Sequence, residues 1–138
     1  GLDVERMRKL NGQLEDAYPA IVNVFFRSLF TRQERESRRY KWLQKFRRFE
    51  AAPMKQALAD YLNILEKEDL RNVLKNINVP IQIINGSEDQ ICTKEAVEDL
   101  KVLIPNASTF YFDECGHFPF LSKPHEFNQV LNEFILSK

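Results

Sequence analysis

The first part of the chain, residues 2–68, carries apolar residues at the three- and four-residue spacing that is typical of helices burying one face. This spacing predicts four helices, marked by Met7, Leu10 and Leu14, by Ile21 to Leu29, by Trp42, Phe46 and Phe49, and by Met54 to Leu65. The breaks between them carry helix-start signals, which are Pro19, a capping box of Thr31 with Glu34, and Pro53. We therefore predict a helical region without strands.

The pattern changes at Val79. Residues 79–84 are mostly apolar and predict a buried strand, with Pro80 at its entry, where a missing amide is tolerated. A helix capped by Thr93 is expected over residues 94–103, a second strand over 108–112, and a closing helix over 124–136 that turns inward Phe127, Val130, Leu131, Phe134 and Ile135. This strand, helix, strand, helix order predicts an α/β unit with two parallel strands.

Two polar side chains follow these strands at the points where each strand ends. The first strand leads into Gly86-Ser87-Glu88-Asp89, and the second leads into Gly116-His117-Phe118-Pro119. Because the carboxyl ends of parallel strands lie at one edge of a sheet, we expect Asp89 and His117 to lie close together. They could form the acid and base of a nucleophilic triad, in which Asp89 orients His117 and His117 accepts the proton of the nucleophile. Glu88 competes with Asp89 as the orienting acid.

These two loops resemble the C-terminal part of the α/β-hydrolase superfamily, in which the acid follows a strand in a Gly-x-x-Asp context and the histidine lies in a Gly-His-x-Pro context. The resemblance continues through residues 122–127 and covers the chain from about Val79 to its end. It implies that residues 1–70 form the helical cap, or lid, of such an enzyme. Residues 71–138 would then be the β-α-β-α part of its core, so that the chain is a fragment of the fold.

Within the superfamily the chain is most similar to the pimeloyl-acyl-carrier-protein methyl ester esterases of biotin synthesis, the BioH type. The similarity rests on three segments, which are residues 62–71, 77–80 and 117–122. It implies a serine-type carboxylic ester hydrolase that needs no cofactor and acts on pimeloyl-[acyl-carrier protein] methyl ester, or on another carrier-linked or small ester.

The nucleophile of such an enzyme is not apparent in this sequence. A Gly-x-Ser-x-Gly elbow is absent, and 138 residues is about half of what a complete α/β-hydrolase needs. We therefore expect the chain to be inactive by itself and, with the uncovered edge of its first strand, to self-associate. Cys115 as an alternative nucleophile is disfavoured, because side chains two positions apart on a tight loop rarely converge on a substrate.

A basic block extends from Arg27 to Arg48, with nine basic and two acidic residues and a net charge of +7 in a chain whose total charge is zero. Such a block attracts anionic partners. The resemblance implies that cap arginines dock the acidic acyl carrier, and our candidates for partner binding are Arg27, Arg35, Arg38 and Arg39, within a set that also holds Arg32, Arg47 and Arg48. A solvated helical face is the simpler explanation of the same pattern.

Other readings of the chain remain open at this stage. It could be a noncatalytic interaction module whose basic helices bind an acidic protein; nucleic acid is a weaker partner, because the block contains no recognisable motif. The cap aromatics could line an acyl channel, although core packing is the simpler role for Phe25, Phe26, Phe30, Trp42, Phe46 and Phe49. The histidines and cysteines show no zinc-like spacing, so no metal is expected.

Composition narrows the location of the protein. Apolar residues make up 43% of the chain and charged residues 29%, and no apolar run approaches the roughly 18 residues of a membrane span. Two cysteines are too few for a disulfide framework. We therefore expect a cytoplasmic protein without a membrane segment.

Overall fold

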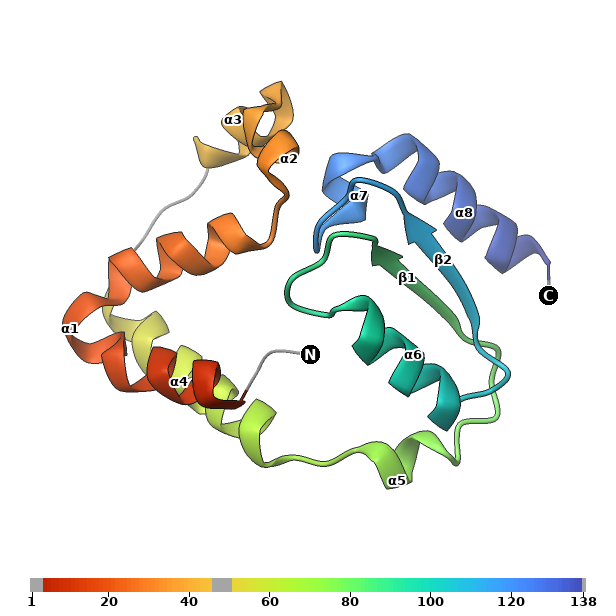
Figure 1. Cartoon of the computed structure of the whole chain (residues 1–138), viewed down its shortest axis with the longest axis horizontal. Coiled ribbons are helices and arrows are strands. Elements are labelled where there is room, and N and C mark those ends of the chain that lie inside the picture. The colour runs from red at the N-terminus through yellow and green to blue at the C-terminus, as the bar shows by residue number, and fades with distance from the viewer. Residues whose placement is uncertain (1–3, 46–50, 138) are drawn as a thin grey trace.

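The computed structural model describes residues 4–45 and 51–137, and Figure 1 shows a helical first part beside a unit of strands and helices. The elements run in the order α1 (Val4–Ser28), α2 (Arg32–Glu36), α3 (Arg38–Gln44), α4 (Ala51–Lys67), α5 (Arg71–Leu74), β1 (Gln82–Gly86), α6 (Lys94–Leu103), β2 (Ser108–Phe112), α7 (Pro119–Ser122) and α8 (Pro124–Leu136). The predicted strand, helix, strand, helix order is confirmed.

The first two predicted helices form one long helix, α1, with a kink. Ala17 departs from helical geometry, with φ −133° and ψ 28°, two residues before Pro19. A proline inside a helix removes a backbone hydrogen bond and crowds the preceding turn, which accounts for the kink. The predicted break is therefore present as a bend rather than a gap, and α4 packs along the bent helix (Figure 1).

The predicted capping box is confirmed at the start of α2. The Thr31 hydroxyl accepts a hydrogen bond from the Glu34 amide at 3.1 Å, and the Glu34 carboxylate accepts one from the Thr31 amide at 2.6 Å. Ser37 then ends α2 and caps α3, which ends at Gln44. The predictions for Phe46, Arg47, Arg48 and Phe49 fall outside the described residues.

The strands β1 and β2 pair in parallel, in a register that sets Gln82 opposite Ser108 and Gly86 opposite Phe112. β1 begins three residues later than predicted, because Pro80 has no amide to donate and Val79 is 68% exposed. The bounds of β2, α6 and α8 agree with the prediction, and the Thr93 hydroxyl caps α6 by accepting from the Ala96 amide.

Two apolar clusters hold the described residues together. One lies between β2 and α8 and contains Phe112, Cys115 and Val130. The other, which we call the junction cluster, contains Leu29, Phe30 and Ile91 and is packed against half-buried Phe25, Phe26, Tyr40, Leu43, Phe118 and Leu121. The junction cluster therefore joins the end of α1 and the helix α3 to the loops that follow both strands.

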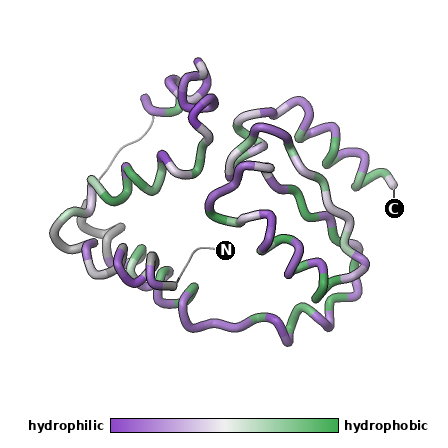
Figure 2. The backbone as a smooth tube through the Cα atoms, viewed as in Figure 1, coloured by the Kyte–Doolittle hydropathy of each residue, from purple (hydrophilic) through white to green (hydrophobic). Residues whose placement is uncertain are grey.

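Figure 2 shows hydrophobic and hydrophilic residues interspersed along the helices. Not every apolar residue is buried. The expectation that Leu131 and Ile135 face inward is wrong, since they are 36% and 58% exposed. The sheet has two strands within the described residues, so it is too narrow to cover the whole apolar face of α8. Trp42, predicted as core or channel, is also exposed.

Candidate active site

The loops that follow β1 and β2 are joined by backbone hydrogen bonds. The Ser87 amide donates to the Phe112 carbonyl at 2.8 Å, and the Glu88 amide donates to the Cys115 carbonyl at 2.9 Å. Gly86 makes this approach possible, because a Cβ atom built there would lie 2.1 Å from the Gly116 carbonyl oxygen. The backbone thus fixes the spacing of the two loops before any side chain is considered.

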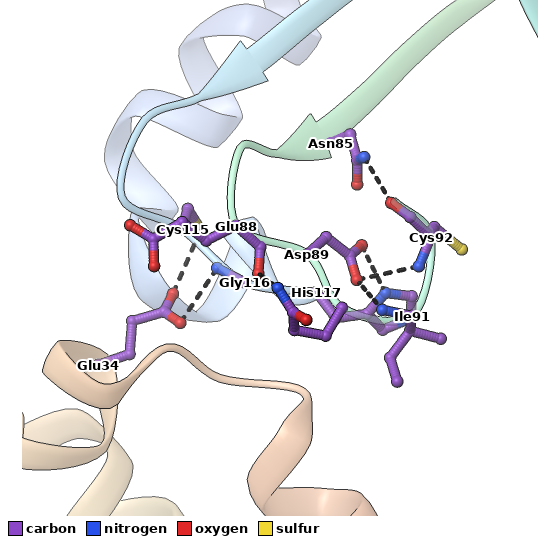
Figure 3. Close-up of polar contacts among 10 residues, drawn as sticks. Glu34, Asn85, Glu88, Asp89, Ile91, Cys92, Cys115, Gly116 and His117 are labelled. Atoms are coloured by element: carbon purple, nitrogen blue, oxygen red, sulfur yellow. Dashed lines mark hydrogen bonds and ion pairs between the residues drawn. The ribbon is translucent and has the colours of Figure 1, made fainter. Parts of the chain in front are cut away.

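Asp89 and His117 meet at this edge of the sheet although 28 positions separate them. Asp89 Oδ2 lies 2.8 Å from His117 Nδ1 (Figure 3). The Asp89 side chain is 1% exposed, whereas the His117 side chain is 28% exposed. An ionised carboxylate can only accept, so this contact favours the tautomer with the proton on Nδ1 and leaves Nε2 as the basic nitrogen.

The second oxygen of Asp89 is held by the backbone of its own loop. Asp89 Oδ1 accepts from the Ile91 amide at 2.8 Å and from the Cys92 amide at 3.0 Å. Burial raises the pKa of Asp89, but the hydrogen bond with His117 and the two amides outweigh burial and hold this pKa below its ordinary value of 3.8. The buried carboxylate is therefore ionised at neutral pH.

The alternatives to this pair are placed elsewhere. Glu88 is exposed, and it is Asp89 that contacts the imidazole. Cys115 is fully buried, and burial together with the nearby Glu34 carboxylate raises the pKa of its thiol to about 12. A buried neutral thiol is a poor nucleophile, so the structure agrees with the sequence in disfavouring Cys115.

The loop between β2 and α7, residues 113–118, carries His117, and we call it the histidine loop. It is also bound to the helical region, which the sequence did not reveal. The His117 amide donates to the Leu29 carbonyl at 2.8 Å, and the Gly116 amide donates to Glu34 Oε2 at 3.1 Å. A Cβ atom at Gly116 would lie 2.6 Å from the Leu29 oxygen. The capping box marked Glu34 as a helix-start residue, but its contact with a loop 82 positions away could not be read from that pattern.

Three side chains that could together bind a metal ion lie at this edge of the sheet, although the spacing of histidines and cysteines in the sequence had suggested no metal site. Ligand atoms of Asp89, Cys92 and His117 lie within 4.8 Å of one another. Both Asp89 oxygens and His117 Nδ1 are already engaged in hydrogen bonds. Burial and the Asp89 charge raise the pKa of Cys92, which opposes the thiolate that a metal requires. The arrangement fits acid-base chemistry better than metal binding.

Two of the four candidate arginines make hydrogen bonds within the chain. Arg35 Nη1 donates to the Phe30 carbonyl at 2.6 Å, and Arg39 Nη1 donates to the carbonyls of Leu121 and Ser122 at 2.8 and 3.2 Å. These contacts give both guanidinium groups a structural role at helix ends.

Arg27 and Arg38 are placed differently. Both are exposed, and their side chains donate no hydrogen bond to the described part of the chain. Arg32 pairs with Glu36 at 3.6 Å on the surface. Of the four candidates, Arg27 and Arg38 are thus the exposed arginines without such a contact in the described residues.

A cavity of about 280 Å³ lies beside the junction cluster. It is lined by Phe30, Glu34, Ser37, Arg39, Tyr40, Trp42, Leu43, Leu121 and Ser122. Asp89 and His117 do not line it. Among the aromatics proposed for an acyl channel, Phe30 and Trp42 reach this cavity, whereas Phe25 and Phe26 pack in the junction cluster.

The fold of the chain is of the class that the sequence predicted. A family model described as "alpha/beta hydrolase fold" matches residues 10–124, so the chain belongs to the α/β-hydrolase fold family. An esterase from Exiguobacterium antarcticum has a similar structure, with a TM-score of 0.83 and 24% identity, over 98% of this chain and 49% of that chain.

The chain is also similar in sequence to named esterases. A pimeloyl-[acyl-carrier protein] methyl ester esterase from Nitrosomonas europaea is 32% identical over 110 residues, which cover 80% of this chain and 44% of that protein. The enzyme of the same name from Wigglesworthia glossinidia brevipalpis is 28% identical over 98% of this chain and 53% of its own length. The chain thus spans about half the length of these relatives. Among its described residues, none of the helices has the length and apolar character that crossing a bilayer requires.

Proposed function

We propose that the complete protein is a serine-type carboxylic ester hydrolase in which Asp89 and His117 are the acid and base of the catalytic triad. The 2.8 Å contact between the buried carboxylate and the imidazole is the observation that carries this proposal. The nucleophile and the oxyanion donors would come from polypeptide outside this chain, so we expect this chain to be inactive by itself.

The reaction follows from the orientation of His117. Nε2 accepts the proton of a serine hydroxyl while the serine oxygen attacks the ester carbonyl carbon. His117 then gives the same proton to the departing alcohol. A water molecule attacks the acyl-enzyme in the second half, giving its proton to His117, which returns it to the serine as the acid is released. Asp89 stabilises the imidazolium that forms in each half.

We propose a carrier-linked methyl ester, pimeloyl-[acyl-carrier protein] methyl ester, as the substrate, and biotin biosynthesis as the pathway. The names of the similar proteins support this substrate. The helical region, residues 1–70, would act as the lid over the site, and its exposed cations Arg27 and Arg38 would contact the acidic carrier.

The proposed chemistry is tested by the hydrolysis of a small methyl ester by the complete protein. We expect His117→Ala to lower kcat at least 10³-fold, since it removes the base. His125→Ala is the matched control, because His125 is the other histidine of this chain and is exposed. Equal turnover of the native protein and the His117 variant would refute the assignment.

The proposed partner is tested by comparing carrier-linked and free methyl esters. We expect Arg38→Glu to raise KM about tenfold for the carrier-linked ester and to leave the free ester unaffected, because a rim charge contributes on the order of 1 kcal/mol to association. Lys67→Glu, an exposed charge reversal at the end of α4, is the control. An equal change with both esters would argue against docking through Arg38.

We also expect this chain, expressed alone, to self-associate. Large apolar side chains are exposed, including Val79 before β1 at 68% and Leu136 at the end of α8 at 82%. Light scattering that gives the mass of a monomer at high concentration would contradict this expectation.

A further inference from the structure

Glu34 has more hydrogen-bond partners than helix capping requires. In a capping box the acidic side chain accepts one hydrogen bond, from the amide of the capping residue. Glu34 Oε2 accepts from the Thr31 amide and also from the Gly116 amide at 3.1 Å, while Oε1 accepts from the Cys115 thiol at 3.3 Å (Figure 3). One carboxylate thus connects the start of α2 to the residues just before His117.

The contacts of Glu34 are made to a part of the histidine loop whose backbone has little room to move. Cys115 is 0% exposed, and the Gly116 position is too close to Leu29 and Glu34 to accept a Cβ atom. The His117 amide is itself held by the Leu29 carbonyl at 2.8 Å. Three successive residues of this loop are therefore bound to the helical region, Cys115 through its thiol and Gly116 and His117 through their backbone amides.

We propose that Glu34 is a positioning residue, which keeps the His117 imidazole in line with Asp89 by fixing the backbone of the histidine loop. The proposal rests on the proposed hydrolase function. Because the same carboxylate begins α2, a shift of this helix would move the acceptor for Gly116. The position of the proposed lid and the position of the proposed catalytic base are thus coupled through the Glu34 side chain.

The expected effect is on the chemical step rather than on substrate binding. A displacement on the order of 1 Å at a reacting group can cost about 10²-fold in rate. Glu34→Ala in the complete protein should therefore lower kcat about 10- to 100-fold and change KM less than about threefold. Glu34→Gln keeps an oxygen for the Thr31 and Gly116 amides, so it should restore kcat to within about threefold of the native value.

Two variants separate positioning from loss of the helix cap. Thr31→Ala removes the hydroxyl that caps the Glu34 amide but leaves the Glu34 carboxylate and its contact with Gly116 in place. Glu36→Ala removes an exposed carboxylate from the same helix. We expect both variants to keep kcat within about threefold, although Thr31→Ala should lower the melting temperature.

A spectroscopic readout is independent of turnover. The Nδ1 proton of His117, identified by its loss in His117→Ala, should shift or broaden in the NMR spectrum of Glu34→Ala and remain unchanged in Thr31→Ala. If the native protein hydrolyses no ester, the proposed function fails, while this comparison still decides the role of Glu34.

The proposal is overturned if folded Glu34→Ala keeps native kcat and an unchanged Nδ1 signal, or if Thr31→Ala loses as much kcat as Glu34→Ala. Should Glu34→Ala fail to fold, Glu34→Met takes its place, because it keeps the length and helix preference of the side chain and replaces the carboxylate by a thioether, which is only a weak acceptor. Failure of both to fold would show a structural role alone and would also overturn the proposal.

Discussion

Replacing Asp89 by asparagine tests the proposed role of this carboxylate with little change in shape. Oδ1 accepts from two backbone amides, so the oxygen of the new amide must remain there to avoid placing two donors face to face. The amide nitrogen then lies where Oδ2 was and donates to His117 Nδ1. This contact selects the tautomer with the proton on Nε2, which cannot accept a proton from the nucleophile.

The size of the effect follows from that tautomer. Changing the orienting acid of a serine hydrolase triad to asparagine lowers kcat about 10⁴-fold, which corresponds to about 5 kcal/mol of transition-state stabilisation. The fold should persist, because the hydrogen bonds to the Ile91 and Cys92 amides are kept. We therefore expect Asp89→Asn in the complete protein to have normal cooperative unfolding and a kcat about 10⁴-fold below native.

The assay is steady-state hydrolysis of a small methyl ester, with thermal unfolding measured on the same samples. Glu88→Gln is the matched control, since it neutralises the neighbouring, exposed carboxylate. Retention of more than a tenth of native kcat by Asp89→Asn, or an equal loss in Glu88→Gln, would refute the assignment of Asp89 as the orienting acid.

Three further predictions concern the complete protein. Gly86→Ala should destabilise it by about 3 kcal/mol or more, because the new Cβ meets two carbonyl oxygens at 2.1 and 2.2 Å. Gly12→Ala, whose new Cβ would have nothing within 4 Å, should stabilise it by about 0.5–1 kcal/mol. Equal melting temperatures for the two variants would contradict this prediction. Cys115, whose pKa is raised to about 12 by burial and by Glu34, should resist iodoacetamide at pH 8 until the protein unfolds, as peptide mass spectrometry would reveal; labelling at the rate of a free thiol would be inconsistent with this environment. Because the folded pKa of Asp89 lies below its ordinary value of 3.8, its contribution to stability should be complete above about pH 4 and lost as the pH falls through the folded pKa. Urea unfolding should therefore show a constant difference in stability between the native protein and Asp89→Asn above about pH 4 and convergence of the two below it; a difference that grows on acidification would have the wrong sign.

The second half of the chain was predictable because its local signals agree with one another. Thr93 caps a helix, β-forming residues fill positions 108–112, and Pro124 begins the last helix, so the observed bounds of α6, β2 and α8 match those expected. The parallel pairing then brought Asp89 and His117 together by topology. The short helices α5 and α7 were missed, because four residues are too few to display a helical period.

Contacts between distant segments could not be predicted in the same way. Arg35 and Arg39 belong to a basic block that suggested partner binding, yet both donate to backbone carbonyls whose positions depend on where α1 and α7 end. The reach of Glu34 to Gly116, and the proximity of Cys92 to the acid and histidine, likewise depend on how the loops pack. A single sequence reveals which side chains can act, whereas the fold decides which of them meet.

The central claim, that His117 activates a serine nucleophile in the complete protein, is tested most directly by covalent labelling with a fluorophosphonate, which reacts with activated serines. The account predicts that a single serine is labelled in the native protein and that His117→Ala slows this labelling at least 10³-fold. Labelling at the native rate in His117→Ala would contradict it.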